Sequence, residues 1–241
     1  MIFSNSIEVN AITRWGGLLL VVLAIALPLA GSAQDQSAGR DSVRYRVDGG
    51  SSWLRVLVYR GGLLRGLGHN HVVSHNAIRG TVIVAQDLLL SRIDLDFEVE
   101  KLLVDESHLR TLAGPDFPGE IPEKAIAGTR TNMLGEKLLQ ATQFPSIQIR
   151  SESITGNFPD IQVAAIVTIR GAEIAITFPA SVEMSGESFV ASGELEITHA
   201  GLGLKPFKAA LGTLQVRDAL VLQYEISGIR IRSPSNIHFI L

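Results

Sequence analysis

The stretch "SRIDLDFEVEK" at residues 91–101 alternates apolar and acidic side chains without a break. The apolar residues occupy every second position, at Ile93, Leu95, Phe97 and Val99. Because successive side chains of a β-strand point to opposite faces, this pattern predicts a strand with one apolar face and one face in water. The acidic face could hold a cation, but a solvated surface with basic residues on neighbouring strands is the simpler interpretation.

Similar apolar runs recur along the chain, separated by short segments rich in Gly, Asn and Asp. Such residues between alternating runs are typical of the turns in β-hairpins. Many short strands with few helices predict a mainly β fold, an antiparallel barrel or sandwich. The expected strands lie at residues 43–48, 53–60, 79–85, 147–154, 161–170, 174–182, 189–198 and 214–231.

One segment, at about residues 105–143, departs from the alternating pattern. Pro122 can open a helix, and Ile126, Met133 and Leu138 then recur on one side of it. We therefore expect a helical insertion that covers one end or one flank of the barrel.

The first 33 residues have the layout of a secretory signal peptide. An apolar run at residues 18–30 precedes the small residues Gly31, Ser32 and Ala33. This run is shorter than the roughly 20 residues that span a bilayer as a helix. We expect cleavage after Ala33, no integral membrane span after cleavage, and a periplasmic or secreted location; an uncleaved anchor is the alternative. A flexible leader at residues 34–41 and a single barrel domain at residues 42–241 should follow.

The composition argues against several classes of function. The chain has 21 Lys and Arg against 24 Asp and Glu, so it lacks the basic surface that nucleic acid requires. It contains no cysteine, which excludes disulfides, thiolate catalysis and Cys-ligated metals. The sequence also lacks a nucleophile elbow, a P-loop and a dinucleotide-binding motif. We therefore expect a binding protein and not an enzyme.

A barrel of about eight strands can either fill with its own side chains or hold one slender ligand. Aromatic residues make up only 6% of the chain, and large rings would be the economical way to fill a lumen. The composition thus favours a cavity. A closed-core interaction module without a small ligand is the alternative.

Four stretches of the sequence resemble the YceI-like family. They are "YRVDGGSSWLRVLVYRGG" (residues 45–62), "IRGTVIV" (78–84), "MLGEKLLQATQFPSIQIRS" (133–151) and "LGLKPFKAALGTLQVRDALVLQYEI" (202–226). The resemblance implies a lipocalin-like antiparallel β-barrel of about eight strands. It also implies an exported protein that holds a polyisoprenoid or a similar amphiphile, such as a quinone-like lipid, in its interior. The partner would then be a lipophilic small molecule, with no cofactor needed, and the oligomeric state is left open.

Inward-facing positions of the expected strands are the candidate contacts for such a chain. The pair His69 and His71 is the candidate contact for its polar end, because a neutral imidazole at the barrel mouth can hydrogen-bond a hydroxyl group or a quinone carbonyl. The candidate ligand-binding residues are Leu57, Tyr59, His69, His71, Leu95, Phe97, Val167 and Phe178.

The motif "LGHNH" at residues 67–71 also allows a metal site. If a strand runs through it, the imidazoles of His69 and His71 point to one face about 6.6 Å apart. Such pairs bind transition metals when a third ligand joins from another strand, and His199, His108 or His75 could supply it. A structural role for the pair is the remaining alternative. His75 and His108 stand in polar stretches and are expected to be solvated.

Overall fold

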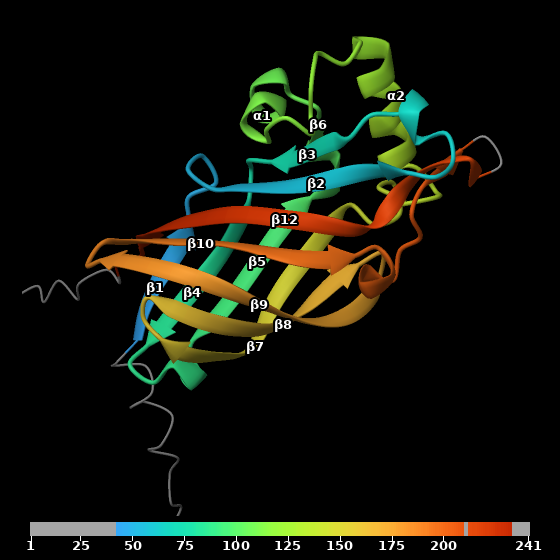
Figure 1. Cartoon of the computed structure of the whole chain (residues 1–241). Helices are drawn as coiled ribbons and strands as arrows, with labels where there is room; N and C mark the ends of the chain where they lie inside the picture. The colour runs from blue at the N-terminus through green and yellow to red at the C-terminus, as the bar shows by residue number, and fades with distance from the viewer. Residues whose placement is uncertain (1–41, 210–211, 233–241) are drawn as a thin grey trace, which may run out of the picture.

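Long antiparallel strands dominate the computed structural model, which describes residues 42–209 and 212–232 (Figure 1). Eight strands form a closed barrel, so the predicted lipocalin-like fold is confirmed. These strands are β1 (Ser42–Val47), β4 (Arg79–Ala85), β5 (Arg92–Glu98), β7 (Ser146–Asn157), β8 (Asp160–Ile169), β9 (Ala172–Ser185), β10 (Ser188–Thr198) and β12 (Leu214–Arg230). The predicted signal peptide and leader lie outside the described residues.

The ring follows the order β1-β4-β5-β7-β8-β9-β10-β12 and closes where β12 pairs with β1. A side sheet leaves the ring at β12, whose residues 215–225 pair with β2 (Trp53–Gly61). Strand β2 then pairs with β3 (His71–His75), and β3 pairs with β6 (Leu103–Val104). The short strand β11 (Lys208–Ala209) pairs with the start of β12.

Strand β5 has the two faces that its alternating sequence predicts. Leu95 and Phe97 are buried in the barrel, while Arg79 of the neighbouring strand forms ion pairs with Asp96 and Glu98 on the outer face. The outer acidic row is therefore a solvated surface with basic neighbours. The strand ends at Glu98, earlier than the alternation suggests, because Val99 is buried at the start of a 3-10 turn.

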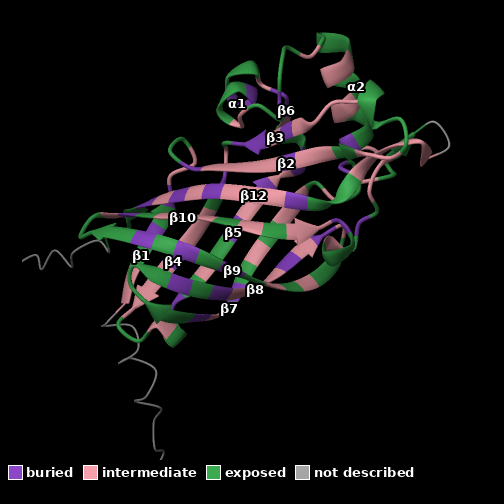
Figure 2. Ribbon diagram, viewed as in Figure 1, coloured by how far each residue is buried: buried purple, intermediate pink, exposed green. Residues whose placement is uncertain are grey.

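Burial also alternates along β8 and along much of β9 (Figure 2). Strand β8 is the clearest case, with buried and more exposed residues in turn. Its buried residues are Ile161, Val163, Ala165, Val167 and Ile169. Because one face of the strand lines the interior and the other meets water, a period of two is the expected result.

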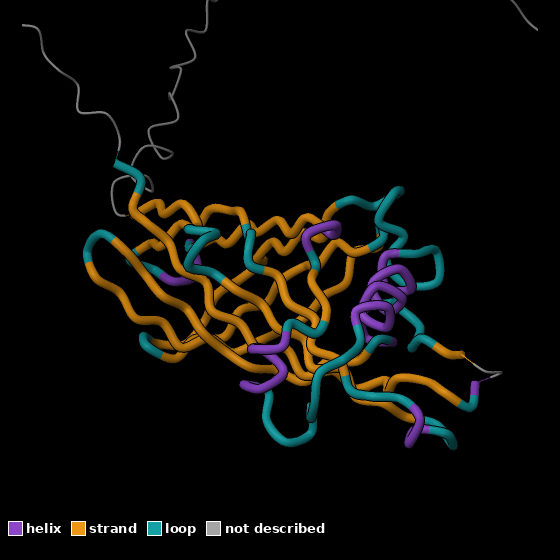
Figure 3. Tube along the Cα trace, turned by 90° about the horizontal axis from the view of Figure 1, so that it is seen from above, coloured by secondary structure: helices purple, strands orange, loops and turns teal. Residues whose placement is uncertain are grey.

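The predicted helical insertion is present as α1 (Ser107–Leu112) and α2 (Glu123–Leu134). Met133 of α2 and the following Leu139 are buried in one cluster with Val167 and Ile169 at the end of β8. Figure 3 shows α2 beside one end of the strands, so this cluster closes that end of the barrel. Short 3-10 helices occur at η1 (Arg65–Leu67), η2 (Leu88–Leu90), η3 (Val99–Lys101) and η4 (Ala200–Leu202). None of the helices in residues 42–209 and 212–232 has both the length and the apolar character needed to cross a membrane.

Strand β12 lies between β10 and β1 at the closure of the barrel. An aromatic ring packs over a glycine there. Phe189 lies opposite Gly228 in the register, and a Cβ on Gly228 would come within 2.2 Å of the ring. The same ring meets the edge of Tyr45 on β1, with ring centroids 5.2 Å apart. The absence of a side chain at Gly228 therefore lets three strands pack at the closure.

Gly228→Ala should destabilise the barrel by about 1–3 kcal/mol, because the added methyl group displaces Phe189 from a packed site. Chemical denaturation of the purified variant measures the change. Gly186→Ala is the control, since no atom lies within 4 Å of the added Cβ, and its effect should stay within about 0.5 kcal/mol. Equal stability of the two variants would contradict this account of the closure.

Candidate functional site

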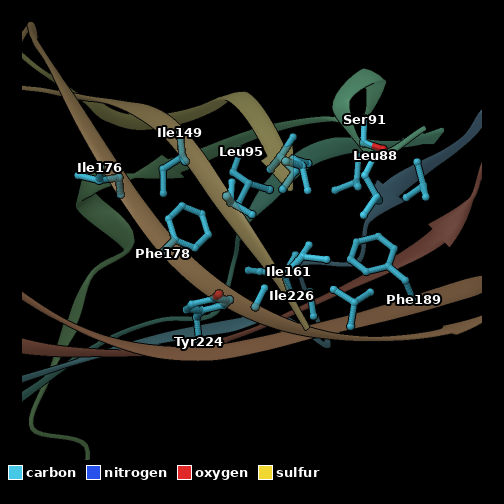
Figure 4. Close-up of a pocket in the computed structure, with 18 of the residues that line it drawn as sticks. Leu88, Ser91, Leu95, Ile149, Ile161, Ile176, Phe178, Phe189, Tyr224 and Ile226 are labelled. Atoms are coloured by element: carbon cyan, nitrogen blue, oxygen red, sulfur yellow. The ribbon is translucent and has the colours of Figure 1, made fainter. Parts of the chain in front are cut away.

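An elongated apolar cavity of about 100 Å³ lies inside the barrel. Figure 4 shows Ile149, Ile176 and Phe178 toward one end of the group of lining side chains, and Leu88 and Phe189 toward the other. The cavity is smaller than the roughly 300–1,000 Å³ of a typical ligand pocket. The lumen is thus partly open and partly filled by its own side chains.

Among the described residues, Ser91 and Tyr224 are the two that bring polar side-chain atoms to the lining of this cavity, and both are hydrogen-bonded to the backbone. The amide of Ala85 donates to Ser91 Oγ at 3.0 Å, and the hydroxyl of Tyr224 donates to the carbonyl of Pro179. Burial raises the pKa of Tyr224, so its hydroxyl remains neutral. The lumen therefore suits a hydrocarbon and offers little to a polar group.

The end of the cavity away from α2 has an apolar rim. Leu88 and Phe158 line the cavity there, and Phe158 is 45% exposed. The neighbouring Leu89 and Leu90 of η2 are 55% and 53% exposed. Since η2 contacts β7, which ends beside Phe158, this rim is the natural place for an apolar chain to enter.

Three of the predicted ligand-binding residues, Leu95, Phe97 and Phe178, line the cavity together. Val167 is buried instead in the cluster that closes the helical end of the barrel. The residues missed by sequence reasoning include Tyr224 and Ile226, which the alternation of β12 could have indicated.

Leu57 and Tyr59 also lie outside the cavity lining. They pack with Val72, Leu109 and Phe117 on the face of β2 toward α1, and the rings of Tyr59 and Phe117 are 5.4 Å apart. Strand β2 has apolar residues on both faces: Leu54 reaches the cavity lining, and Leu57 packs toward α1 on the opposite face. Its sequence therefore does not show whether the odd-numbered or the even-numbered residues of β2 face the lumen.

His69 and His71 lie outside the cavity lining as well, beside β3 and α1. The chain forms a loop at His69, and β3 begins only at His71. The two rings are 4.7 Å apart, in an edge-to-face arrangement. Burial lowers the pKa of His69, so the neutral imidazole is favoured. The predicted pair is thus brought together, but away from the lumen.

Asp105, and not one of the histidines considered in the sequence analysis, lies next to the pair. Its side chain is fully buried, and it accepts hydrogen bonds from the backbone of Val72 at 3.0 Å and from the guanidinium of Arg110 at 2.7 Å. Its other oxygen lies 2.6 Å from Nδ1 of His71. Burial raises the pKa of Asp105, but the hydrogen bonds from His71, Val72 and Arg110 outweigh this and hold the pKa below its usual value. The carboxylate is thus ionised and fixed.

The structure groups the pair with Asp105 and not with His199, the alternative third ligand. Its Nδ1 bonds to the backbone oxygen of Asp218 at 3.0 Å, beside the start of η4. The nearby group is Asp105, and the potential ligand atoms of His69, His71 and Asp105 all lie within 4.8 Å of one another. No local pattern in the sequence predicts this contact, because His71 and Asp105 are 34 positions apart.

His108 is exposed as predicted, whereas the prediction of a solvated His75 is wrong. His75 is buried: its Nδ1 accepts from the amide of Ala77, and its Nε2 lies 3.1 Å from the carbonyl of Glu98. Its ring also meets the edge of Phe97, with centroids 5.5 Å apart. Backbone partners and an aromatic contact thus satisfy a histidine that stands in a polar stretch of sequence.

A second hollow, of about 480 Å³, lies where β2 ends and β12 begins. Its charged residues are Arg60, Arg65, Lys208, Arg217 and Asp218. Unlike the lumen, it is polar and mainly cationic.

A family model described as the YceI-like domain matches residues 71–227, more than half of the 241-residue chain. The chain belongs to the YceI-like family. No curated protein matches the sequence.

Two solved structures share the fold of this YceI-like protein. One is BcnA from Burkholderia cenocepacia, with a TM-score of 0.55 and 13% identity over 75% of this chain and 98% of BcnA. The other is a polyisoprenoid binding domain from Saccharophagus degradans, with a TM-score of 0.52 and 10% identity over 78% of this chain and 99% of that domain. At these identities the likeness concerns the fold.

Arg110→Met should destabilise this YceI-like barrel by about 3–5 kcal/mol, because it leaves the buried carboxylate of Asp105 without its cation. Urea unfolding measures the loss. Arg79→Met is the matched control, since its pairs with Asp96 and Glu98 are partly exposed and should contribute at most about 1 kcal/mol. A loss no larger than that of the control would contradict a buried ion pair at this position.

The stability of the protein should fall as the solution is acidified through pH 6.5, partly because of His75. Burial lowers the pKa of His75 from its usual 6.5, so the unfolded chain takes up this proton before the folded chain does. The stabilisation is complete above pH 6.5 and is lost progressively below it. Unfolding measured between about pH 8 and pH 5 should show a shallower loss in His75→Gln, while the exposed control His108→Gln keeps the wild-type slope. An unchanged slope in His75→Gln would refute this assignment.

Proposed function

We propose that this protein is an exported lipid-binding protein that holds the hydrocarbon chain of a polyisoprenoid or a similar amphiphile in the barrel lumen. The observation that carries the proposal is the elongated apolar cavity. Its two polar side chains, Ser91 and Tyr224, already form hydrogen bonds with the backbone. A molecule that fits such a lumen gains most of its affinity from apolar surface removed from water, at roughly 25 cal/mol per Å².

The size of the cavity defines how such a chain would bind. At about 100 Å³ it accepts a slender segment and not a bulky ring system. A longer chain would have to move lining side chains such as Leu88 and Phe189 at the rimmed end, and the ordering of a flexible tail opposes binding as well. Selectivity should therefore favour unbranched or regularly methylated chains over fused rings.

The fold likeness to the Saccharophagus degradans domain, which is described as polyisoprenoid binding, supports this ligand class. Export is proposed from the signal-like pattern of residues 1–33, which directs the protein to the periplasm or the medium. No step of the proposal is catalytic, and it involves neither a cofactor nor nucleic acid.

The lipid should be recovered with the protein and should depend on an open lumen. We expect organic extracts of the full chain, purified from an export-competent bacterial host, to contain a stoichiometric lipophilic compound detectable by mass spectrometry. Ala180→Phe places a ring in the lumen and should remove most of that compound, at a stability cost of about 1–3 kcal/mol.

The matched control is Ala175→Phe, on the same strand but exposed on the outer face. It should keep the bound compound, and thermal unfolding of both variants checks that they are folded. Lipid-free extracts of the wild-type protein from several hosts, or equal lipid in Ala180→Phe and wild type, would defeat the proposal.

A further inference from the structure

The ring of His69 has a buried nitrogen without a partner. Among the described residues, nothing within hydrogen-bonding distance satisfies Nε2 of His69, although this atom is shielded from water. A buried polar atom without a partner costs free energy and is uncommon in folded proteins. The His69 ring that carries this atom lies edge-to-face with the His71 ring, with centroids 4.7 Å apart, and a ligand held between the two imidazoles would satisfy it.

The neighbouring ring of His71 is held with one nitrogen available. Nδ1 of His71 lies 2.6 Å from one oxygen of Asp105, and the other oxygen accepts from Val72 and Arg110, so this carboxylate is placed to accept the proton of Nδ1. Nε2 of His71 then keeps its lone pair. A carboxylate behind a histidine is the arrangement that fixes the tautomer and the ring orientation of metal-bound histidines.

Asp105 is itself held firmly enough to serve this purpose. Its second oxygen accepts from Val72 and Arg110, and Arg110 also donates to the backbone oxygens of Asn70 and Pro118. The backbone of Asp105 has a positive φ of 56°, which a non-glycine residue adopts rarely. Strained conformations of this kind persist where the surroundings fix them and are concentrated at functional sites.

The loop itself is tied down without His69. Asn70 accepts a hydrogen bond from the amide of Arg60 and donates one to the carbonyl of Asp116. These contacts give the loop its shape, whereas Nε2 of His69 contributes none. A purely structural role for the pair thus leaves the buried nitrogen unexplained.

We propose that His69 and His71 bind a divalent transition-metal ion through their Nε2 atoms, with Asp105 as the positioning residue for His71. Imidazole nitrogens suit Zn²⁺ and Cu²⁺, and water completes the coordination shell. The side chain of His71 is 15% exposed, so an ion can reach the pair from solvent. The site lies outside the lipid cavity and is independent of the proposed lipid binding.

The test is calorimetric titration of the purified full chain, stripped with a chelator and freed of any histidine tag, with ZnSO₄ and separately with CuSO₄. Wild type should bind one ion per chain. His69→Gln and His71→Gln should each abolish saturable binding or weaken it strongly. Asp105→Asn should weaken binding by about 10- to 100-fold. The control His108→Gln removes an exposed imidazole and should bind like wild type.

A second measurement tests whether Asp105 orients the His71 ring or only stabilises the fold. Nitrogen-15 NMR of the metal-free protein should show the Nδ1-protonated tautomer of His71 in wild type and its loss in Asp105→Asn. Absence of saturable binding by wild type, or equal affinities of wild type, His69→Gln and His71→Gln, would overturn the proposal. Lipid in organic extracts of His69→Gln should match wild type, so this proposal and lipid binding can fail separately.

Discussion

Strand β12 pairs with β10 over residues 219–229 on one edge, and on its other edge it pairs first with β2 and then with β1. The pairing with β1 closes the ring, so the barrel strands satisfy their backbone hydrogen bonds without a free edge around the lumen. The inner faces of eight strands are thereby turned toward one another. Their apolar side chains must then pack against each other or against a guest, and the cavity from Leu88 to Ile176 is the part that they leave open.

The pairing of β12 with β2 explains why the molecule has a second, chemically different region. The side sheet β2-β3-β6 places α1 and the loop at residues 105–106 on the far side of β2, outside the ring. A carboxylate such as Asp105 is tolerated there because Arg110, Val72 and His71 satisfy it. The lumen offers no such partners, so a charge inside it would be costly. The apolar cavity and the cluster of His71, Asp105 and Arg110 thus lie in different parts of the molecule.

The sequence predicts the elements whose two faces meet different surroundings. Strand β5 alternates apolar and acidic residues, and the positions of Leu95 and Phe97 in the lumen follow from that pattern. Strand β2 has apolar surroundings on both faces, so Leu57 and Tyr59 could not be assigned to one face. The contact of His71 with Asp105 depends on the pairing of β3 with β6, and the burial of His75 depends on Phe97 and on the backbone at Glu98. Contacts between residues so far apart in the chain produce no repeating pattern from which they could be predicted.

The central claim is that the closed ring leaves an apolar space for a guest. The most direct measurement is a crystal structure of the protein purified from an export-competent host with its co-purified lipid retained. The account predicts continuous, elongated electron density inside the barrel that runs between Leu88 and Ile176 and contacts Phe178. Density that instead occupies the cationic hollow beside Arg60 and Lys208, with a lumen filled completely by side chains, would contradict it.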